Sequence, residues 1–161
     1  MTDEQLRKLT DEAVSRYVSE KLNDFHGRTE RFIYLFRRLT GSVHHIVLDL
    51  AEEMRRSQFE PLAFELSFSD DGDLPAISMG DDEIRFDLTG IADRVDGWVQ
   101  GDKLYVRVVD YKTGKKAFSL SDVCSGLGLQ MLLYLFALDE EGERFSEKQI
   151  VPAGVLYAPA R

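Results

Sequence analysis

The sequence predicts an α/β fold in which a mixed β-sheet is flanked by helices. Two observations lead to this fold class. The apolar spacing changes between about 3.6 and 2 residues along the chain, and the segments follow the order helix, helix, strands, helix, strand, which is typical of a sheet covered by helices. We expect helices over residues 2–22, 30–56 and 120–138, and strands near 62–68, 84–95, 103–111 and 150–157.

The first helix has a clear start. Thr2 and Gln5 can form a capping box, in which each side chain bonds the other residue's backbone N–H. The apolar side of this helix, over residues 6–18, needs a packing partner. The second helix, over residues 30–56, is longer and also amphipathic.

Two aspartates stand out in the strand region. Asp93 lies in the segment Gly-Ile-Ala-Asp-Arg-Val-Asp, and Asp110 lies in Val-Val-Asp-Tyr-Lys-Thr-Gly. Because side chains alternate between the two faces of a strand, Asp110 and Lys112 should project from the same face, about 6.5–7 Å apart along it. A turn over residues 97–102 can fold the strand at 84–95 back beside the next one. We therefore expect Asp93 to face Asp110 across neighbouring strands.

Paired carboxylates suit a hard cation such as Mg²⁺ or Mn²⁺, which keeps several waters and also binds substrate phosphate oxygens. Such an ion polarises a phosphoryl group and lowers the pKa of a bound water. Lys112 would then orient that water or stabilise the charge growing on the phosphate. The alternative is that Asp93 and Asp110 pair with Arg94 and Lys112 at the surface. The residues alone indicate either metal-dependent phosphodiester cleavage or surface ion pairs.

The predicted helix at 120–138 carries two polar-tipped residues, Gln130 and Tyr134, on an otherwise apolar side. They lie one turn apart, so their side chains can interact. Two roles are open for them. Either they satisfy buried polar groups of the core, or they reach toward the acidic site.

Together these motifs resemble a known family. The order Gly-x-x-Asp-Arg-Val-Asp, Val-Val-Asp-Tyr-Lys-Thr-Gly and Gly-Leu-x-Leu-Gln-x-x-Leu-Tyr-Leu is similar to the RecB-type branch of the PD-(D/E)XK nucleases. More narrowly, it resembles the C-terminal nuclease domains of AddB, the B subunits of bacterial ATP-dependent helicase/deoxyribonucleases. The resemblance covers roughly residues 30–158, with further matching stretches at 55–65 and 152–157.

The resemblance implies roles at the acidic site. Asp93 and Asp110 would bind the metal ion, Mg²⁺ or Mn²⁺, together with the backbone carbonyl of Tyr111. Lys112 would be the catalytic lysine. Glu65 matches an acidic position before the first motif and is a weaker candidate for the metal shell.

The resemblance also implies a fold, an activity and partners. The fold would be the restriction-endonuclease-like mixed sheet, and Gln130 and Tyr134 would support the site or the DNA strand. The activity would be Mg²⁺-dependent exonuclease cleavage during double-strand-break processing for recombinational repair. The partners would be a DNA single strand from an unwound duplex and an AddA-like helicase–nuclease subunit.

The chain departs from the family pattern in two places. Nucleases of this branch usually carry a metal-binding histidine in a helix upstream of the first aspartate. His44 and His45 offer only a superficial match, and we expect them to be ordinary helix residues, with the true counterpart before Met1. Ala92 stands where the family more often has isoleucine. Because residue 92 should point away from the Asp93 face, we expect an effect on packing rather than on chemistry.

Cysteine use is a further departure. AddB-type domains usually hold a [4Fe–4S] cluster on four cysteines, whereas this chain has one, Cys124. A cluster needs four ligands, so this segment cannot hold one. A cluster is possible only in the full-length protein. We expect Cys124 to be a small buried apolar residue of its helix. We also expect residues 1–161 to be a single nuclease domain, part of a larger helicase–nuclease subunit.

The composition narrows the class of protein. With 161 residues, 43% of them hydrophobic, the chain can bury one core. One cysteine permits no internal disulfide, which fits the cytoplasm, and no segment is long and apolar enough for a membrane. The net charge of −9 argues against a stand-alone DNA-binding protein. The acids cluster at 70–73, 81–83 and 139–143, however, while Lys115 and Lys116 lie beside the proposed site, so a larger machine could deliver the DNA.

Two other classes stay open. One is a catalytically silent PD-(D/E)XK-like module that binds DNA or protein, which would apply if the acids cannot hold a metal. The other is a different metal-dependent hydrolase on a similar sheet. The sequence offers no phosphate-binding glycine loop, Gly-x-Ser-x-Gly elbow or His-Glu-x-x-His helix in support of that second class. The isolated segment could also lack activity by itself.

Overall fold

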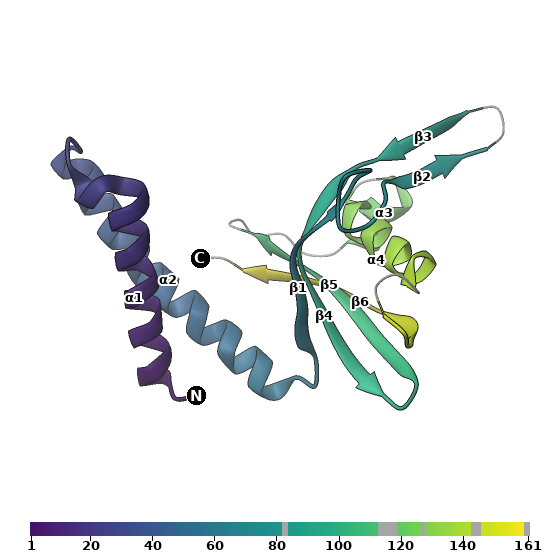
Figure 1. The fold of residues 1–161 in the computed structure, drawn as a ribbon, viewed down its shortest axis with the longest axis horizontal. Coiled ribbons are helices and arrows are strands. Elements are labelled where there is room, and N and C mark those ends of the chain that lie inside the picture. Colours follow the sequence, from purple (N-terminus) through teal and green to yellow (C-terminus); the bar gives the residue numbers. More distant parts are fainter. Residues whose placement is uncertain (82–83, 113–118, 127, 143–145, 160–161) are drawn as a thin grey trace. The chain divides into compact units, whose positions relative to one another are not determined.

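The computed structural model describes the whole chain except residues 82–83, 113–118, 127, 143–145 and 160–161. By its internal contacts the chain divides into two compact units, residues 1–56 and residues 57–158. The first unit is helical and the second contains the sheet (Figure 1). Within the described residues, no helix is long and apolar enough to cross a membrane.

The helical unit consists of α1 (Asp3–Leu22), a single 3₁₀ turn η1 (Asn23–Phe25) and α2 (Glu30–Arg56). The predicted capping box is confirmed, because the Thr2 hydroxyl accepts the Gln5 N–H at 3.3 Å and the Gln5 side chain accepts the Thr2 N–H at 2.9 Å. The helix ends at Asn23, whose φ of 50° is left-handed. Both predicted helix boundaries therefore agree with the structure.

The two helices pack against each other in opposite directions. Arg55, near the end of α2, binds Asp3 at the start of α1 at 2.9 Å, and Tyr17 near the end of α1 stacks on Phe36 near the start of α2 with ring centroids 6.5 Å apart. Helix α2 is thus the partner that the apolar side of α1 requires.

The sheet unit contains four strands in the spatial order β1 (Glu60–Phe68), β4 (Gly90–Gln100), β5 (Lys103–Lys112) and β6 (Gln149–Pro159). Strand β4 runs antiparallel to both β1 and β5. Strand β6 begins beside the start of β5, where the Gln149 N–H donates to the Asp102 carbonyl at 3.1 Å. A connection through helices brings the chain back to that same end, so the predicted mixed sheet is confirmed.

A second, two-stranded sheet is formed by β2 (Ile77–Gly80) and β3 (Arg85–Leu88), and it projects beyond the main sheet (Figure 1). The sequence did not predict β2, and the single strand expected at 84–95 is wrong. It is divided into β3 and β4, and β4 continues to Gln100. The predicted turn over 97–102 is reduced to Gly101 and Asp102, where Gly101 adopts a φ of 65° that a two-residue hairpin turn requires.

The continuous helix expected over 120–138 is also wrong. The structure has a short α3 (Leu120–Cys124) and a separate α4 (Gln130–Glu140). Gly126 and Gly128 lie between them with φ values of 78° and 70°. A left-handed residue cannot continue a right-handed helix, so these glycines end it. Leu127 lies outside the described residues.

The core lies between the sheet and α4. From β5 it takes Leu104, Val106 and Val108, which share one strand face, and from α4 it takes residues such as Leu135 and Leu138. All of them are buried. At roughly 1.5–3 kcal/mol for each fully buried aliphatic side chain, this apolar face supplies much of the stability of the sheet unit.

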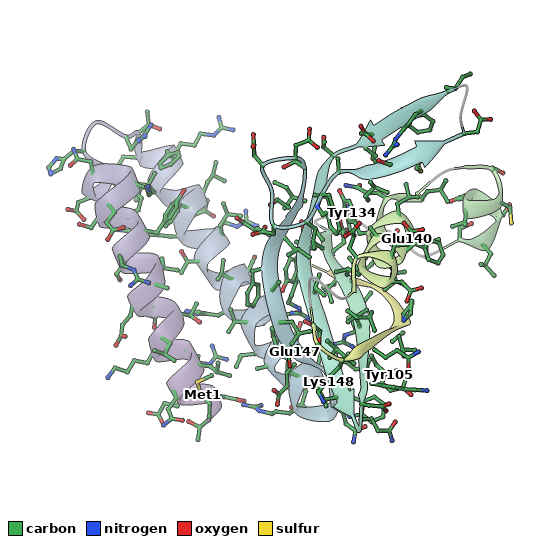
Figure 2. The ribbon with its side chains drawn as sticks, turned by 45° about the vertical axis from the view of Figure 1, so that its right-hand side comes forward. Met1, Tyr105, Tyr134, Glu140, Glu147 and Lys148 are labelled. Carbon is green, nitrogen blue, oxygen red and sulfur yellow. The ribbon has the colours of Figure 1, made fainter. Side chains whose placement is uncertain are left out.

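Tyr134 extends this packing to the edge of β4. Its ring is 2% exposed and stacks on Phe68 with ring centroids 4.8 Å apart. Its hydroxyl lies against Gly90, where a Cβ atom would clash with it. Figure 2 shows Tyr134 on α4 beside the sheet. Residue 90 must therefore be glycine for Tyr134 to pack in this way.

Strand β4 does not alternate regularly around Asp93. Ala92 and Val95 both belong to the core cluster, although strict alternation would place residues an odd number apart on opposite faces. On the neighbouring strand, Glu65 has a φ of 51°, which is unusual for a residue other than glycine. The expectation that Ala92 points away from the face of Asp93 assumed strict alternation. Because β4 does not alternate strictly here, that expectation loses its basis. The role of Ala92 in packing stands, because it is 2% exposed.

The other face of the same strands holds a buried cluster of charges, which we call the arginine cluster: Arg94, Asp96 and Arg107. Arg94 and Asp96 are both 0% exposed. The Arg94 Nε lies 2.7 Å from Asp96 Oδ1, and two Arg107 nitrogens lie 2.8 and 2.9 Å from Asp96 Oδ2. Arg94 also donates to the Tyr111 hydroxyl at 2.8 Å. One buried carboxylate thus stands between two guanidinium groups.

We expect Asp96→Ala to destabilise the chain by about 3–5 kcal/mol, because it removes the buried carboxylate that binds both guanidinium groups. Urea unfolding followed by circular dichroism would measure the change. Asp70→Ala, at an exposed position in the turn after β1, is the control and should cost less than about 0.5 kcal/mol. Equal effects of the two substitutions would contradict the structural importance of the cluster.

We expect Gly90→Ala to destabilise the chain by about 1–3 kcal/mol through the clash with Tyr134. Tyr134→Phe removes the hydroxyl and should relieve part of that clash. The double variant should therefore be more stable than the sum of the two single effects predicts, by at least about 0.5 kcal/mol in a double-mutant cycle. Strictly additive effects would show that the two residues are not in contact.

Candidate functional site

The candidate site lies where the ladder between β4 and β5 ends. The last paired residues are Arg94 and Val109. Beyond them, the Tyr111 N–H donates to Asp93 Oδ2 at 2.8 Å, so a side-chain carboxylate accepts the bond that a backbone carbonyl would accept in a continuing ladder. Asp93 therefore contacts the backbone of Tyr111, the residue after Asp110. That the carboxylates of Asp93 and Asp110 face each other stays a prediction.

Asp110 and Lys112 lie on the same face of β5, as predicted. The Lys112 ammonium group is 2.9 Å from Asp110 Oδ1 and 2.7 Å from Oδ2. The side chains are 34% and 16% exposed, so solvent reaches the lysine more than the acid. The pKa of Lys112 is raised above its ordinary value, chiefly by this hydrogen bond and further by the charges of Asp110 and Asp93, while desolvation opposes the shift. Lys112 is therefore a cation at neutral pH.

The alternative of surface ion pairs applies to only one of the two acids. Lys112 does pair with Asp110. Arg94, however, is buried and binds Asp96 and Tyr111 on the other face, whereas Asp93 binds a backbone N–H. A surface pair between Arg94 and Asp93 is wrong, because the two neighbouring residues direct their side chains differently.

Gln130 and Tyr134 bind each other. The Gln130 side-chain amide donates to the Tyr134 hydroxyl at 2.8 Å. Because Tyr134 is buried, its polar tip requires such a partner, and this is the first of the two roles left open by the sequence. The pair lies close to the first motif, since the Tyr134 hydroxyl touches Gly90, three residues before Asp93 on β4. A supporting role for both residues stays a prediction.

Glu65 lies alongside Asp93 on the neighbouring strand. Its neighbours Phe64 and Leu66 pair with Arg94 and Ala92, which places residue 65 next to residue 93. Its side chain is exposed, and its left-handed backbone costs about 1–3 kcal/mol, a cost that is often found at functional sites. Its role in a metal shell also stays a prediction.

The donor set suits a hard cation that keeps part of its water shell. Asp93 uses one carboxylate oxygen for the Tyr111 N–H, and Asp110 has Lys112 as its counter-ion. The described residues contain no group of three or more His, Cys, Asp and Glu side chains arranged to hold a metal. Two carboxylates with water and substrate oxygens are the ligands that Mg²⁺ usually takes.

The upstream histidines have partners within the helical unit. His44 lies 2.8 Å from Asp11 on α1, and the His45 ring nitrogen lies 2.8 Å from the Gly41 carbonyl of its own helix. These contacts are those of ordinary helix residues. The expectation for Cys124 is wrong, because this cysteine is exposed at the end of the short α3 rather than buried in a long helix.

Sequence reasoning missed the arginine cluster and the side chain of Tyr111. A signal for them existed, since Arg94 and Asp96 occupy alternate positions of one strand and Arg107 stands opposite Asp96 on the next. Opposite charges on the same face of two neighbouring strands indicate ion pairing. The basic residues Lys115 and Lys116, expected beside the site, lie outside the described residues.

Comparison with known proteins points in the same direction. The model of the PD-(D/E)XK nuclease superfamily matches residues 2–161. The chain is 42% identical over 151 residues to the B subunit of the ATP-dependent helicase/deoxyribonuclease of Acetivibrio thermocellus. It is 36% and 37% identical to the proteins of the same name from Clostridium tetani and Exiguobacterium sibiricum.

These alignments cover 91%, 94% and 98% of this chain but only 13%, 14% and 14% of the relatives. The chain thus corresponds to a small part of those proteins. The family match, in contrast, includes both acidic motifs, with Asp93, Asp110 and Lys112, and the residues Gln130 and Tyr134 of α4. The mixed sheet and the position of Asp93 at the end of the β4–β5 ladder agree with this match. Because the family model matches residues 2–161, the chain belongs to the PD-(D/E)XK nuclease superfamily.

Proposed function

We propose that this chain is the metal-dependent DNA exonuclease domain of a helicase–nuclease subunit and that it trims a single strand released from an unwound duplex. The observation that carries the proposal is the convergence of Asp93, Asp110 and Lys112 at the end of the β4–β5 ladder. Membership in a nuclease superfamily supports the reaction class. The metal, the exonuclease mode and the strand-break context are our inference.

The two acids differ in their contacts within the chain. Asp93 is oriented by the Tyr111 N–H, which leaves its second oxygen available, and Asp110 stands next in line on β5. Mg²⁺ or Mn²⁺ held by these carboxylates and the Tyr111 carbonyl would polarise the phosphoryl group and make a bound water more acidic. The protein's contribution in this proposal is to supply both carboxylates at the same strand end.

Lys112 acts as a cation in this proposal. The hydrogen bond to Asp110 raises the pKa of Lys112, and an ammonium group has no lone pair with which to accept the proton of an attacking water. It can instead donate hydrogen bonds to the phosphate or to the water as negative charge grows in the transition state. To do so it must exchange part of its contact with Asp110 for one with substrate.

The proposed setting rests on the relatives. They are named as B subunits of ATP-dependent helicase/deoxyribonucleases, and this chain covers only 13% and 14% of the first two. An AddA-like subunit would unwind the duplex and feed the strand to this domain. Delivery by a larger assembly is consistent with the net charge of −9, which gives the domain little electrostatic affinity of its own for DNA.

We expect Asp110→Ala to abolish Mg²⁺-dependent cleavage of single-stranded DNA and to remove the heat of Mn²⁺ binding in calorimetry, because one of two metal-binding carboxylates is lost. Asp102→Ala, at the exposed turn before the same strand, is the control and should retain both. Cleavage should be assayed in the reconstituted helicase–nuclease complex with the nuclease activity of the partner subunit inactivated, so that it reports on this domain. Undiminished cleavage by Asp110→Ala would overturn the role of Asp110 as a metal ligand, and absence of cleavage by the unmodified chain would favour a catalytically silent binding module.

We expect Lys112→Met to separate catalysis from metal binding. Cleavage should fall by at least about 100-fold, as for loss of one group that stabilises transition-state charge. Mn²⁺ binding should persist or tighten, because Asp110 is freed from its counter-ion. Lys103→Met, at the exposed start of β5, is the matched control and should change neither quantity. A parallel loss of metal binding would assign Lys112 a structural role instead.

A further inference from the structure

The arginine cluster is connected to the candidate site through one residue. The Tyr111 side chain reaches one face of β5, where its hydroxyl accepts a hydrogen bond from Arg94 at 2.8 Å and the guanidinium carbon lies 5.6 Å from the centre of its ring. The backbone N–H of the same residue binds Asp93 at 2.8 Å. Residue 111 therefore links a buried charge cluster to one of the two acids of the site.

Stability alone is a weak reason for such a cluster. Desolvating two arginines and an aspartate is costly, and apolar residues of similar volume often stabilise a core as well or better. What the ions provide is geometry, because a guanidinium group fixes several hydrogen bonds in one plane. Arg94 binds Asp96 and Tyr111, while Arg107 holds Asp96 from the next strand. The side chain of Tyr111 is thereby restrained from two strands.

The end of β5 is where such a restraint is needed. The backbone ladder with β4 stops at Arg94 and Val109, so residues 110–112 lack further ladder pairs on that side. All three are proposed site residues. Since the donor set is small, the affinity for a metal depends on how well each carboxylate is oriented.

We propose that the arginine cluster positions the site, with Arg94 holding the Tyr111 side chain so that the Tyr111 N–H orients the Asp93 carboxylate. Arg94 and Tyr111 are positioning residues in this scheme and do not touch substrate. The inference rests on the proposed function in one respect, namely that Asp93 binds a metal. The positioning itself can be measured without a metal.

Tyr111→Phe is the cleanest test, because it removes the hydroxyl and keeps the ring and the backbone. Amide hydrogen exchange, followed by NMR, should show the amide of residue 111 exchanging about tenfold faster in the metal-free variant. The amides of Val106 and Val108 in the same strand should keep their rates. Mn²⁺ affinity, measured by calorimetry, should fall by about tenfold, as is typical when a partner behind a metal ligand is lost.

Tyr105→Phe is the matched control. Tyr105 lies on the same strand and the same face, and its ring packs on Trp98 at 5.2 Å. Figure 2 shows it at the far end of the sheet from Tyr134 and therefore from the site. This variant should leave both the exchange rate at residue 111 and the Mn²⁺ affinity unchanged.

The outcomes are distinguishable. An unchanged exchange rate at residue 111, or an equal acceleration along all of β5, would overturn the positioning role, the latter because it reports general loss of stability. Faster exchange confined to residue 111 with unaltered Mn²⁺ affinity would overturn it as well. Failure of the unmodified chain to bind Mn²⁺ would instead refute the proposed function, and the exchange rates would still decide whether Arg94 controls the Asp93 contact.

Discussion

The hydrogen bond from the Tyr111 N–H to the Asp93 carboxylate is the contact on which the geometry of the candidate site depends. It forms where the β4–β5 ladder stops, and it replaces a backbone pair with a bond to a side chain. Because of this substitution, an acid from one strand lies against the backbone that carries Asp110 and Lys112 on the next. A regular continuation of the ladder would have engaged only backbone groups there.

The two faces of the sheet have different physical tasks. One face packs Val106 and Val108 against α4 and contributes apolar burial, which is non-directional and tolerates small shifts. The other holds Arg94 and Asp96 without exposure to solvent, in ion pairs whose directions are fixed. A site that must orient carboxylates within a few tenths of an ångström benefits from the second kind of contact. Strand β5 has both kinds of contact: apolar packing through Val106 and Val108, and the hydrogen bond from Arg94 to Tyr111 near its end.

Much of the fold could be predicted from local pattern. The capping box at Thr2, the end of α1 at Asn23 and the alternation along β5 are short-range features, and each agrees with the structure. The errors arose where a local pattern competes with backbone geometry. Gly126 and Gly128 interrupt an apolar period that otherwise reads as one helix, and the strand expected at 84–95 is divided because its residues belong to two different sheets.

The sequence by itself determined which chemical groups are present and their order along the chain: two aspartates, a lysine, and the Gln130–Tyr134 pair. Only the tertiary structure decided which of them meet. Asp93 and Arg94 are neighbours in the chain, yet one binds the strand end that bears the site and the other is buried in an ion cluster. The physical reason is that hydrogen-bond partners and burial are set by strand register and by local breaks in alternation, and neither is encoded in the spacing of residues along one strand.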